Sequence, residues 1–269
     1  IYFLDGDYTV YITSKYNIRF LGNWGEVGNF LYDMEELKYS HSLLQLIIQN
    51  INVTGDISSL KNMTALTNLS LSGLNVTGNI SSLKNMTALT NLSLSGLNVT
   101  GNISSLKNMT ALTKLYLNCH NITGDISSLN GMTSLVNLSL SGSNIIGKLS
   151  SLNGFANITS LSLSGLNVTG DISSLSGLTA LTNLSLNDDL KITGTFESHA
   201  SALSAKRTSG GCIYWLSGSN ITYNGKRWIT GKKFVEFNSG GCNVYDGTDN
   251  TGKKIASYVK STSSWSYID

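Results

Sequence analysis

Residues 52–74 read NVTGDISSLKNMTALTNLSLSGL, and residues 75–97 read NVTGNISSLKNMTALTNLSLSGL, so the two stretches differ at a single position. The pattern continues with a period of 23 residues over 98–120, 121–143 and 144–166, and a last copy at 167–190 is one residue longer. Repeats at a fixed period of this length are typical of stacked arrays, in which each copy is one structural unit that packs on its neighbours. The repeat therefore predicts a solenoid.

Each copy contains the frame L-x-x-L-x-L, as in Leu66, Leu69 and Leu71. The alternation at the last two leucines predicts a short strand, with its leucines on one face and its polar side chains on the other. One coil cannot bury these leucines alone, so stacked coils must bury them against one another. We therefore expect one parallel strand per coil between Leu43 and Asn187.

The stretch LTNLSLSGLNVTGNISSL at 66–83 resembles the plant-type leucine-rich repeat, L-x-x-L-x-L-x-x-N-x-L-T-G-x-I-P-x-x-L. It departs from that pattern at Leu74, which replaces the inward-facing Asn, and at Ser81, which replaces the Pro. The resemblance covers about residues 32–195. It implies a curved solenoid with a parallel β-sheet on the concave face, few or short helices, and binding of partners through that face.

The layout of the whole chain also resembles leucine-rich-repeat proteins of gut Bacteroidales bacteria and their phages. In those proteins a short β segment precedes a cap with a stretch like Glu36-Leu37-Lys38-Tyr39, and a small β module follows the repeats. This second resemblance implies a phage or bacterial origin.

The segments that flank the repeats have a different pattern. In residues 1–31 apolar and polar residues alternate around 8–12 and 18–21, which predicts a β-rich N-terminal cap. Residues 196–269 break the period, and their short alternating stretches are separated by Asn-Gly and Gly-Gly turns. The expected fold is a leucine-rich-repeat solenoid over 32–195 with a β-rich N-terminal cap and a small all-β C-terminal module.

Residue types that carry catalysis or bind metals are sparse in this chain. The three His and three Cys show no zinc-ligand spacing. Cys119 and His120 are adjacent, so in a strand they point to opposite faces and cannot readily act as nucleophile and base. Cys212 and Cys242 either form a disulfide, if their strands are neighbours, or are two buried thiols. We therefore expect no enzyme, no cofactor and no metal.

The composition restricts the partners of the protein. Charged residues make up 13% of the chain and the net charge is +2, which argues against broad electrostatic capture of nucleic acid. No run of 18 apolar residues occurs, so we expect no membrane span. The expected partner is a protein or glycan ligand, and assembly into a larger particle is a second expectation.

Most of the expected concave face consists of Thr, Asn and Ser, which are poor in binding energy. The copy that ends at residue 120 differs, because it places Lys114, Tyr116 and Asn118 in the middle of the sheet. A central aromatic residue beside a cation is a plausible contact patch, together with Asn91 and Asn137 on the adjacent coils. Sequence drift without function is the alternative interpretation.

A rival site is the C-terminal module, which is rich in aromatic residues. Tyr, Trp and Ser together resemble the composition of evolved binding surfaces. The same tail could equally form a final strand that packs on the last coil. The candidate residues of this alternative ligand-binding site are Trp215, Trp228, Tyr258, Trp265 and Tyr267.

Two functional hypotheses follow from the sequence and its resemblances. The first is a non-enzymatic recognition or adhesion module of a phage particle or bacterial surface, which binds a host protein or glycan. The second is a structural virion or cell-surface protein, in which the solenoid is a spacer and the ends dock to partners. Both hypotheses place the protein on a virion or outside the bacterial cell.

Overall fold

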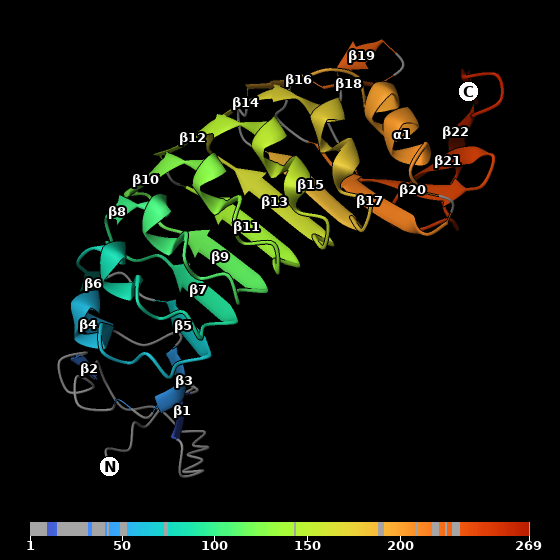
Figure 1. Ribbon diagram of the computed structural model, residues 1–269. Coiled ribbons are helices and arrows are strands. Elements are labelled where there is room, and N and C mark those ends of the chain that lie inside the picture. The colour runs from blue at the N-terminus through green and yellow to red at the C-terminus, as the bar shows by residue number, and fades with distance from the viewer. Residues whose placement is uncertain are drawn as a thin grey trace, which may run out of the picture. The chain divides into compact units, whose positions relative to one another are not determined.

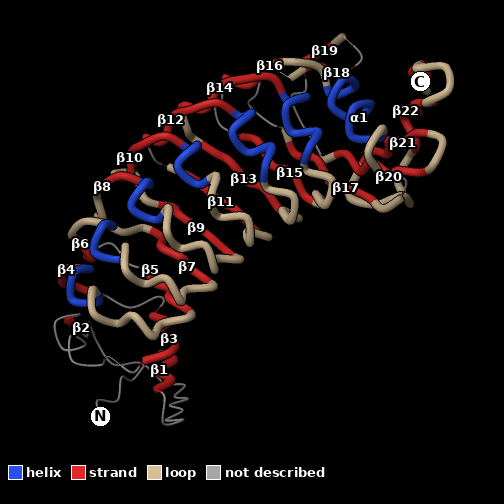
Figure 2. The backbone as a smooth tube through the Cα atoms, viewed as in Figure 1, coloured by secondary structure: helices blue, strands red, loops and turns tan. Residues whose placement is uncertain are grey.

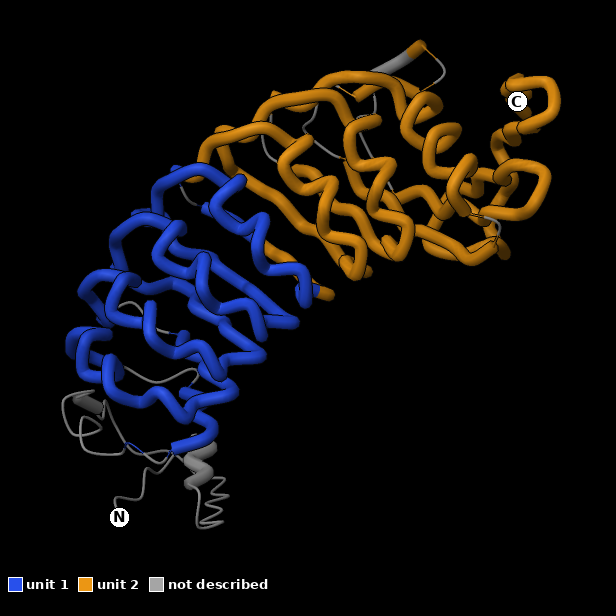
Figure 3. Tube along the Cα trace, in the orientation of Figure 1, with its two compact units in different colours: residues 1–135, 140–144 blue, residues 136–139, 145–269 orange. Residues whose placement is uncertain are grey.

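The computed structural model describes residues 10–14, 32–33, 41, 43–48, 53–72, 75–142, 144–187, 191–207, 209–216, 221–223, 225–227 and 232–268 (Figure 1). The chain divides into two compact units, which Figure 3 shows in different colours. Unit 1 consists of Ile1–Leu135 and Leu140–Asn144, and unit 2 consists of Val136–Ser139 and Ile145–Asp269.

Unit 1 contains a sheet to which each coil contributes one parallel strand. The strands are β3 (Leu43–Ile48), β5 (Asn68–Ser72), β7 (Asn91–Ser95) and β9 (Lys114–Asn118). Their register pairs equivalent positions of successive coils, as Leu69 pairs with Leu92. The parallel strand per coil that the repeat predicts is therefore confirmed for these coils.

The N-terminal strand β1 (Val10–Ser14) runs antiparallel to β3, with Val10 opposite Ile48. It is the β element that the alternation around residues 8–12 predicts. The second alternating stretch, at 18–21, lies outside the described residues.

Unit 2 continues the same pattern and then changes direction. Its strands β13 (Ser160–Ser164), β15 (Asn183–Asn187) and β17 (Gly211–Trp215) are parallel. An antiparallel meander follows, formed by β20 (Lys233–Asn238), β21 (Gly241–Asp246), β22 (Lys254–Val259) and β23 (Ser264–Tyr267). Strand β11 (Asn137–Ser141) has residues in both units.

The return half of each coil carries a second short strand and a helical turn (Figure 2). The short strands are β2 (Tyr32–Asp33), β4 (Val53–Asp56), β6 (Asn75–Thr77), β8 (Gly101–Asn102), β10 (Ile122–Asp125), β12 (Asn144–Lys148), β14 (Asn167–Asp171) and β16 (Lys191–Thr193). The 3-10 helices that follow are η2 (Ile57–Leu60), η3 (Ile80–Leu83), η4 (Ile103–Leu106), η5 (Ile126–Leu129), η6 (Leu149–Gly154) and η7 (Ile172–Gly177). A separate hairpin joins β18 (Thr222–Tyr223) and β19 (Lys226–Arg227).

A single row of polar residues starts these helical turns. The side chain of Asp56 accepts a hydrogen bond from the backbone N–H of Ser58 at 2.7 Å, and Asn79 does the same for Ser81 at 2.9 Å. Both residues are therefore N-caps, which explains why Asp and Asn interchange at this repeat position. Lys148, at the equivalent position before η6, makes no such side-chain bond.

The core consists of the repeated apolar side chains. Leu66, Leu69 and Leu71 have relative exposures of 0–1%. Met63, which follows the 3-10 helix of the same coil, has a relative exposure of 0%. Fully burying one such side chain contributes about 1.5–3 kcal/mol, so the stacked rows account for most of the favourable free energy. The inward direction of the frame leucines, which the alternation predicts, is thus confirmed.

The C-terminal segment also contains a helix that its alternating pattern did not predict. Helix α1 (Phe196–Ser204) begins after Thr195, whose hydroxyl accepts a hydrogen bond from the N–H of Ser198 at 3.0 Å. Phe196, Ala200 and Leu203 lie on its buried face. Their spacing of four and three residues is helical, and this is the signal that the strand-based interpretation missed.

Candidate functional site

Strand β9 carries the most exposed set of side chains among the strands of unit 1. Leu115 and Leu117 point into the core, so the intervening Lys114, Tyr116 and Asn118 point to the open face of the sheet. All three are exposed, whereas the equivalent Asn and Ser residues of β5 and β7 are half-buried. The relative exposure of Tyr116 is 39%, which leaves a large part of its ring available for contact.

The register places part of the predicted site side by side. Asn91 lies opposite Lys114, and Ser93 lies opposite Tyr116, on the neighbouring strand β7. The Oδ1 atom of Asn91 accepts a hydrogen bond from Thr113 Oγ1 at 3.4 Å, so its amide is held by the repeat.

Asn137, the fifth predicted contact, belongs to unit 2. Its Oδ1 atom accepts a hydrogen bond from Thr159 Oγ1 at 3.4 Å, so it too is held within the repeat. The candidate patch of unit 1 is therefore Lys114, Tyr116 and Asn118 with Asn91.

His120 extends this patch in a way that the sequence interpretation missed. It is exposed, although the equivalent Leu97 is buried at 3%. A Cβ atom at Gly142 would lie 3.2 Å from Asn118 Oδ1 and 3.3 Å from His120 Nε2, so both side chains converge on this glycine. The signal was the change from an apolar to a polar residue at this repeat position. We call Lys114, Tyr116, Asn118 and His120 the β9 patch.

Cys119, beside His120, is buried and contributes to the core. Its S–H donates to the carbonyl oxygen of Leu94 at 3.6 Å, and burial raises the pKa of the thiol. Cys119 and His120 both follow the end of β9, and the first is buried while the second is exposed, so the two side chains are separated although not by strand alternation. The sulfur is held in its less reactive protonated form.

The two C-terminal cysteines are both buried free thiols. Cys212 is on β17 and Cys242 is on β21, and β20 lies between these strands. Burial raises the pKa of Cys212 to about 12 and that of Cys242 to about 11. Of the two alternatives for this pair, the structure shows the buried thiols.

The aromatic residues of the C-terminal segment do not form one site. Trp215 lies opposite Ser185 of β15, on the open face of the sheet, with a relative exposure of 44%. The Lys232 ammonium lies 5.1 Å from the centre of its ring, within the range of a cation–π contact. Trp228 lies outside the described residues.

Trp265 and Tyr267 instead pack on helix α1. The indole N–H of Trp265 donates to Ser201 Oγ at 2.9 Å, and the Tyr267 hydroxyl donates to Glu197 Oε1 at 2.7 Å. The ring of Tyr258 lies 5.4 Å from that of Trp265. These three residues hold the last two strands on α1. The tail does form a final strand, as in the alternative interpretation, but it packs on α1 and not on the last coil.

Trp215 has apolar neighbours that the sequence interpretation did not name. Phe234 lies opposite Ile213, and Tyr245 lies opposite Phe234, so all three share the face of Trp215. The Phe234 ring occupies the space above Gly211, since a Cβ there would lie 2.2 Å from it. This surface is a second aromatic region, distinct from the group of Tyr258, Trp265 and Tyr267 that packs on α1.

The described residues contain no group of His, Cys, Asp or Glu that could hold a metal ion. Among the same residues, no helix is long and apolar enough to cross a membrane.

Comparison with known proteins identifies the repeat class. The family description "Leucine Rich repeats (2 copies)" matches residues 110–154. Internalin C2 from Listeria monocytogenes is similar in structure, with a TM-score of 0.55, 25% identity, and coverage of 70% of this chain and 77% of internalin C2. The fold of this chain is therefore that of a leucine-rich-repeat solenoid.

Two further similar structures come from a plant and another bacterium. The plant peptide hormone receptor RGFR1, in complex with RGF2, has a TM-score of 0.56 and 25% identity over 75% of this chain, but this chain covers only 32% of the receptor. A leucine-rich-repeat protein of Leptospira interrogans has a TM-score of 0.53 and 18% identity, with coverage of 70% and 46%, and shows the fold alone. The comparison with curated protein sequences found no match.

Proposed function

We propose that this protein is a non-enzymatic recognition module that binds a protein or peptide partner through the β9 patch. The observation that carries the proposal is the exposure of Tyr116, an aromatic ring at the strand position where β5 and β7 have Ser70 and Ser93. Tyr can bury a large area and still place its hydroxyl in a hydrogen bond. Lys114 adds a cation on the same strand, and the His120 ring converges with Asn118 on Gly142.

One of the similar structures supports a peptide or protein as the partner. It is the plant peptide hormone receptor RGFR1 in complex with RGF2, which is 25% identical to this chain. This similarity supports the class of partner without identifying it.

The proposed setting is the surface of a phage particle or of a bacterium, where the module would bind a host protein or glycan. This finer proposal rests on the resemblance of the chain's layout to proteins of gut Bacteroidales and their phages. Mass spectrometry of purified phage particles and of bacterial outer-membrane fractions tests it, because the protein should be found in one of them.

The repeat itself supplies the variant that tests the β9 patch. The triple substitution K114N/Y116S/N118S makes β9 read NLSLS, as β5 and β7 do, so we expect the fold to be kept. We expect binding of the labelled protein to target cells, measured by flow cytometry, to fall at least about tenfold. The control is Lys191→Asn, which removes one exposed charge from unit 2, outside the patch.

A spacer role for the solenoid is the second candidate, and the exposure of Trp215 on β17, the strand that follows the last coil, favours it. In that case Trp215→Ser, which introduces the residue found opposite at Ser185, would abolish binding. The triple β9 variant would bind normally. That pair of results would contradict recognition through the β9 patch.

A further inference from the structure

Three lysines of unit 1 form a row on successive coils. Lys61, Lys84 and Lys107 each follow a 3-10 helix as its C-cap, with nearly identical backbone angles, and all three are exposed. Equivalent positions of stacked coils are separated by roughly 5 Å, the spacing of neighbouring strands. We call these residues the lysine row.

Acidic residues are sparse along the chain near the lysine row, where Asp56 is the N-cap of the turn that Lys61 follows and the next acidic residue is Asp125. Between Asp56 and Asp125 there is no Asp or Glu, and the N-caps of the two intervening coils are Asn79 and Asn102. Like charges at this spacing repel one another, and a bound anion would relieve that repulsion.

The fold does not require lysine at this position. The next two copies have Asn130 and Asn153 there, and their coils carry the same type of helical turn. The fold therefore does not determine which polar residue occupies this position, and a lysine there can contribute to a binding surface.

Each lysine is accompanied by the same exposed polar neighbours. Beside Lys61 are Asn62 and Thr64, and these surround the buried Met63. The two following coils repeat the set with the residues Asn85, Thr87, Asn108 and Thr110. Each coil thus offers one ammonium, one amide and one hydroxyl at a constant spacing.

We propose that the lysine row binds a linear acidic polysaccharide. Its carboxylates would contact the lysines, and its ring hydroxyls would exchange hydrogen bonds with the Asn and Thr side chains. A repeating polymer fits this repeating surface, because successive sugar units can make the same contacts on successive coils.

Nucleic acid fits the same surface less well. Single strands are held by stacking on aromatic rings and by Arg. Residues 57–112 contain neither Arg nor an aromatic residue, although they include the whole row. Amide and hydroxyl groups are instead suited to a sugar polymer, so we expect the row to prefer polyuronate to single-stranded DNA of equal length.

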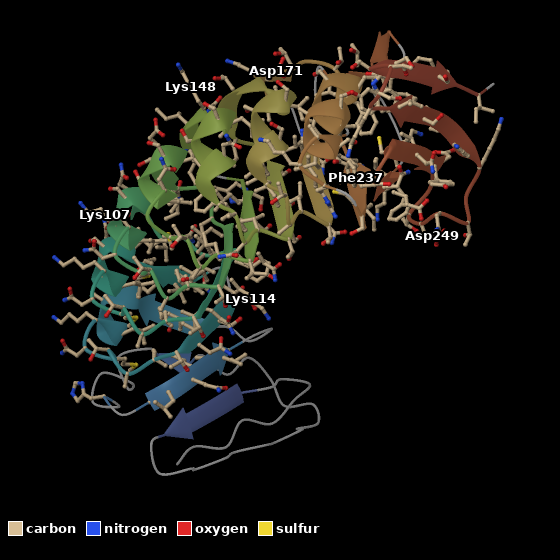
Figure 4. The ribbon with its side chains drawn as sticks, turned by 45° about the vertical axis from the view of Figure 1, so that its right-hand side comes forward. Lys107, Lys114, Lys148, Asp171, Phe237 and Asp249 are labelled. Carbon is tan, nitrogen blue, oxygen red and sulfur yellow. The ribbon has the colours of Figure 1, made fainter. Side chains whose placement is uncertain are left out.

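This proposal does not depend on the β9 patch. Figure 4 shows Lys107 and Lys114 on different sides of the coil, so the row and the patch are separate surfaces. The variant Tyr116→Ser should therefore leave polysaccharide binding unchanged.

Fluorescein-labelled polygalacturonate of defined length, titrated with the full chain at several salt concentrations and followed by anisotropy, tests the proposal. The triple variant K61N/K84N/K107N should bind at least about tenfold more weakly than the natural chain. A plot of the logarithm of its affinity against the logarithm of the salt concentration should also be less steep, by up to about 2 in slope. Thermal unfolding checks that the variant stays folded, as Asn130 and Asn153 lead us to expect.

The matched control removes the same charge elsewhere. The variant K191N/K206N/K253N loses three exposed lysines outside the row and should keep its affinity for polygalacturonate. Neutral dextran should not compete. The proposal is overturned if the natural chain does not bind polygalacturonate at low salt, if both triple variants weaken binding equally, or if single-stranded DNA binds more tightly.

Discussion

Leu92 and Ser93 are neighbours in β7 that face opposite environments, since Leu92 is fully buried and Ser93 lies on the open face. Leu92→Ala should lower the free energy of unfolding by about 2–5 kcal/mol, because it leaves a cavity between stacked coils. Ser93→Ala should change it by less than about 0.5 kcal/mol. Urea unfolding of both variants measures this, and equal losses would mean that the two faces are assigned wrongly.

Gly78 has a conformation and a position that exclude other residues. Its φ is +99°, and a Cβ there would lie 2.2 Å from Oδ1 of Asp56, the N-cap of the preceding coil. Gly78→Ala should therefore destabilise the protein by about 1–3 kcal/mol. Gly154→Ala is the matched control, because a Cβ there meets nothing within 4 Å. A loss of stability as large in the control would contradict the steric explanation.

At the scale of the element, helix α1 carries a buried titratable group. His199 Nε2 lies 3.2 Å from the Tyr214 hydroxyl, and burial lowers the pKa of His199 from 6.5 to about 4. The folded state therefore binds fewer protons than the unfolded state between these values. The buried neutral His199 therefore costs no free energy of unfolding above pH 6.5. As the pH falls from 6.5 towards 4, the free energy of unfolding should decrease by an amount on the order of 3 kcal/mol, because His199 gains a proton in the unfolded state first.

Thermal unfolding between pH 7 and pH 4, followed by near-ultraviolet circular dichroism, measures this loss. His199→Gln removes the titration and should flatten the pH dependence in this window, whatever its effect at neutral pH. An unchanged slope in the Gln variant would show that other groups cause the acid sensitivity.

The strands of the coils could be predicted from the sequence because one frame specifies both their start and their inward face. Helix α1 could not be predicted, because its apolar residues lie in a segment in which strand-like alternation dominates the pattern. The separation of Trp215 from Trp265 could not be predicted either. It depends on the order and register of four antiparallel strands, which the turns alone do not specify.

The candidate site was predictable only in part, and for a related reason. Lys114, Tyr116 and Asn118 share a face because residues two apart in a strand always do. The convergence of His120 and Asn118 on Gly142 links two coils, and its geometry depends on the loop after the strand. Sequence periodicity describes the strand but not that loop.

At the scale of the whole molecule, the copies are so similar that we expect the fold to tolerate the removal of one copy. Deletion of residues 75–97 removes one complete period and joins residue 74 to residue 98, which restores the same sequence context. The shortened chain should fold with unchanged circular dichroism per residue and lower stability, because stability in repeat arrays is a sum over units and their interfaces. Deletion of 75–86, about half a period, should prevent cooperative unfolding, because the remaining part of that coil cannot pair with both of its neighbours.

The antiparallel strand β1 has a consequence for how this protein behaves at high concentration. It covers β3, whose sequence LLQLII is the most apolar of the sheet strands in unit 1. An uncovered parallel edge with that sequence would be a template on which other chains could add strands without limit. By pairing antiparallel with β3, β1 occupies the edge of this apolar strand, so a further parallel coil cannot pair there.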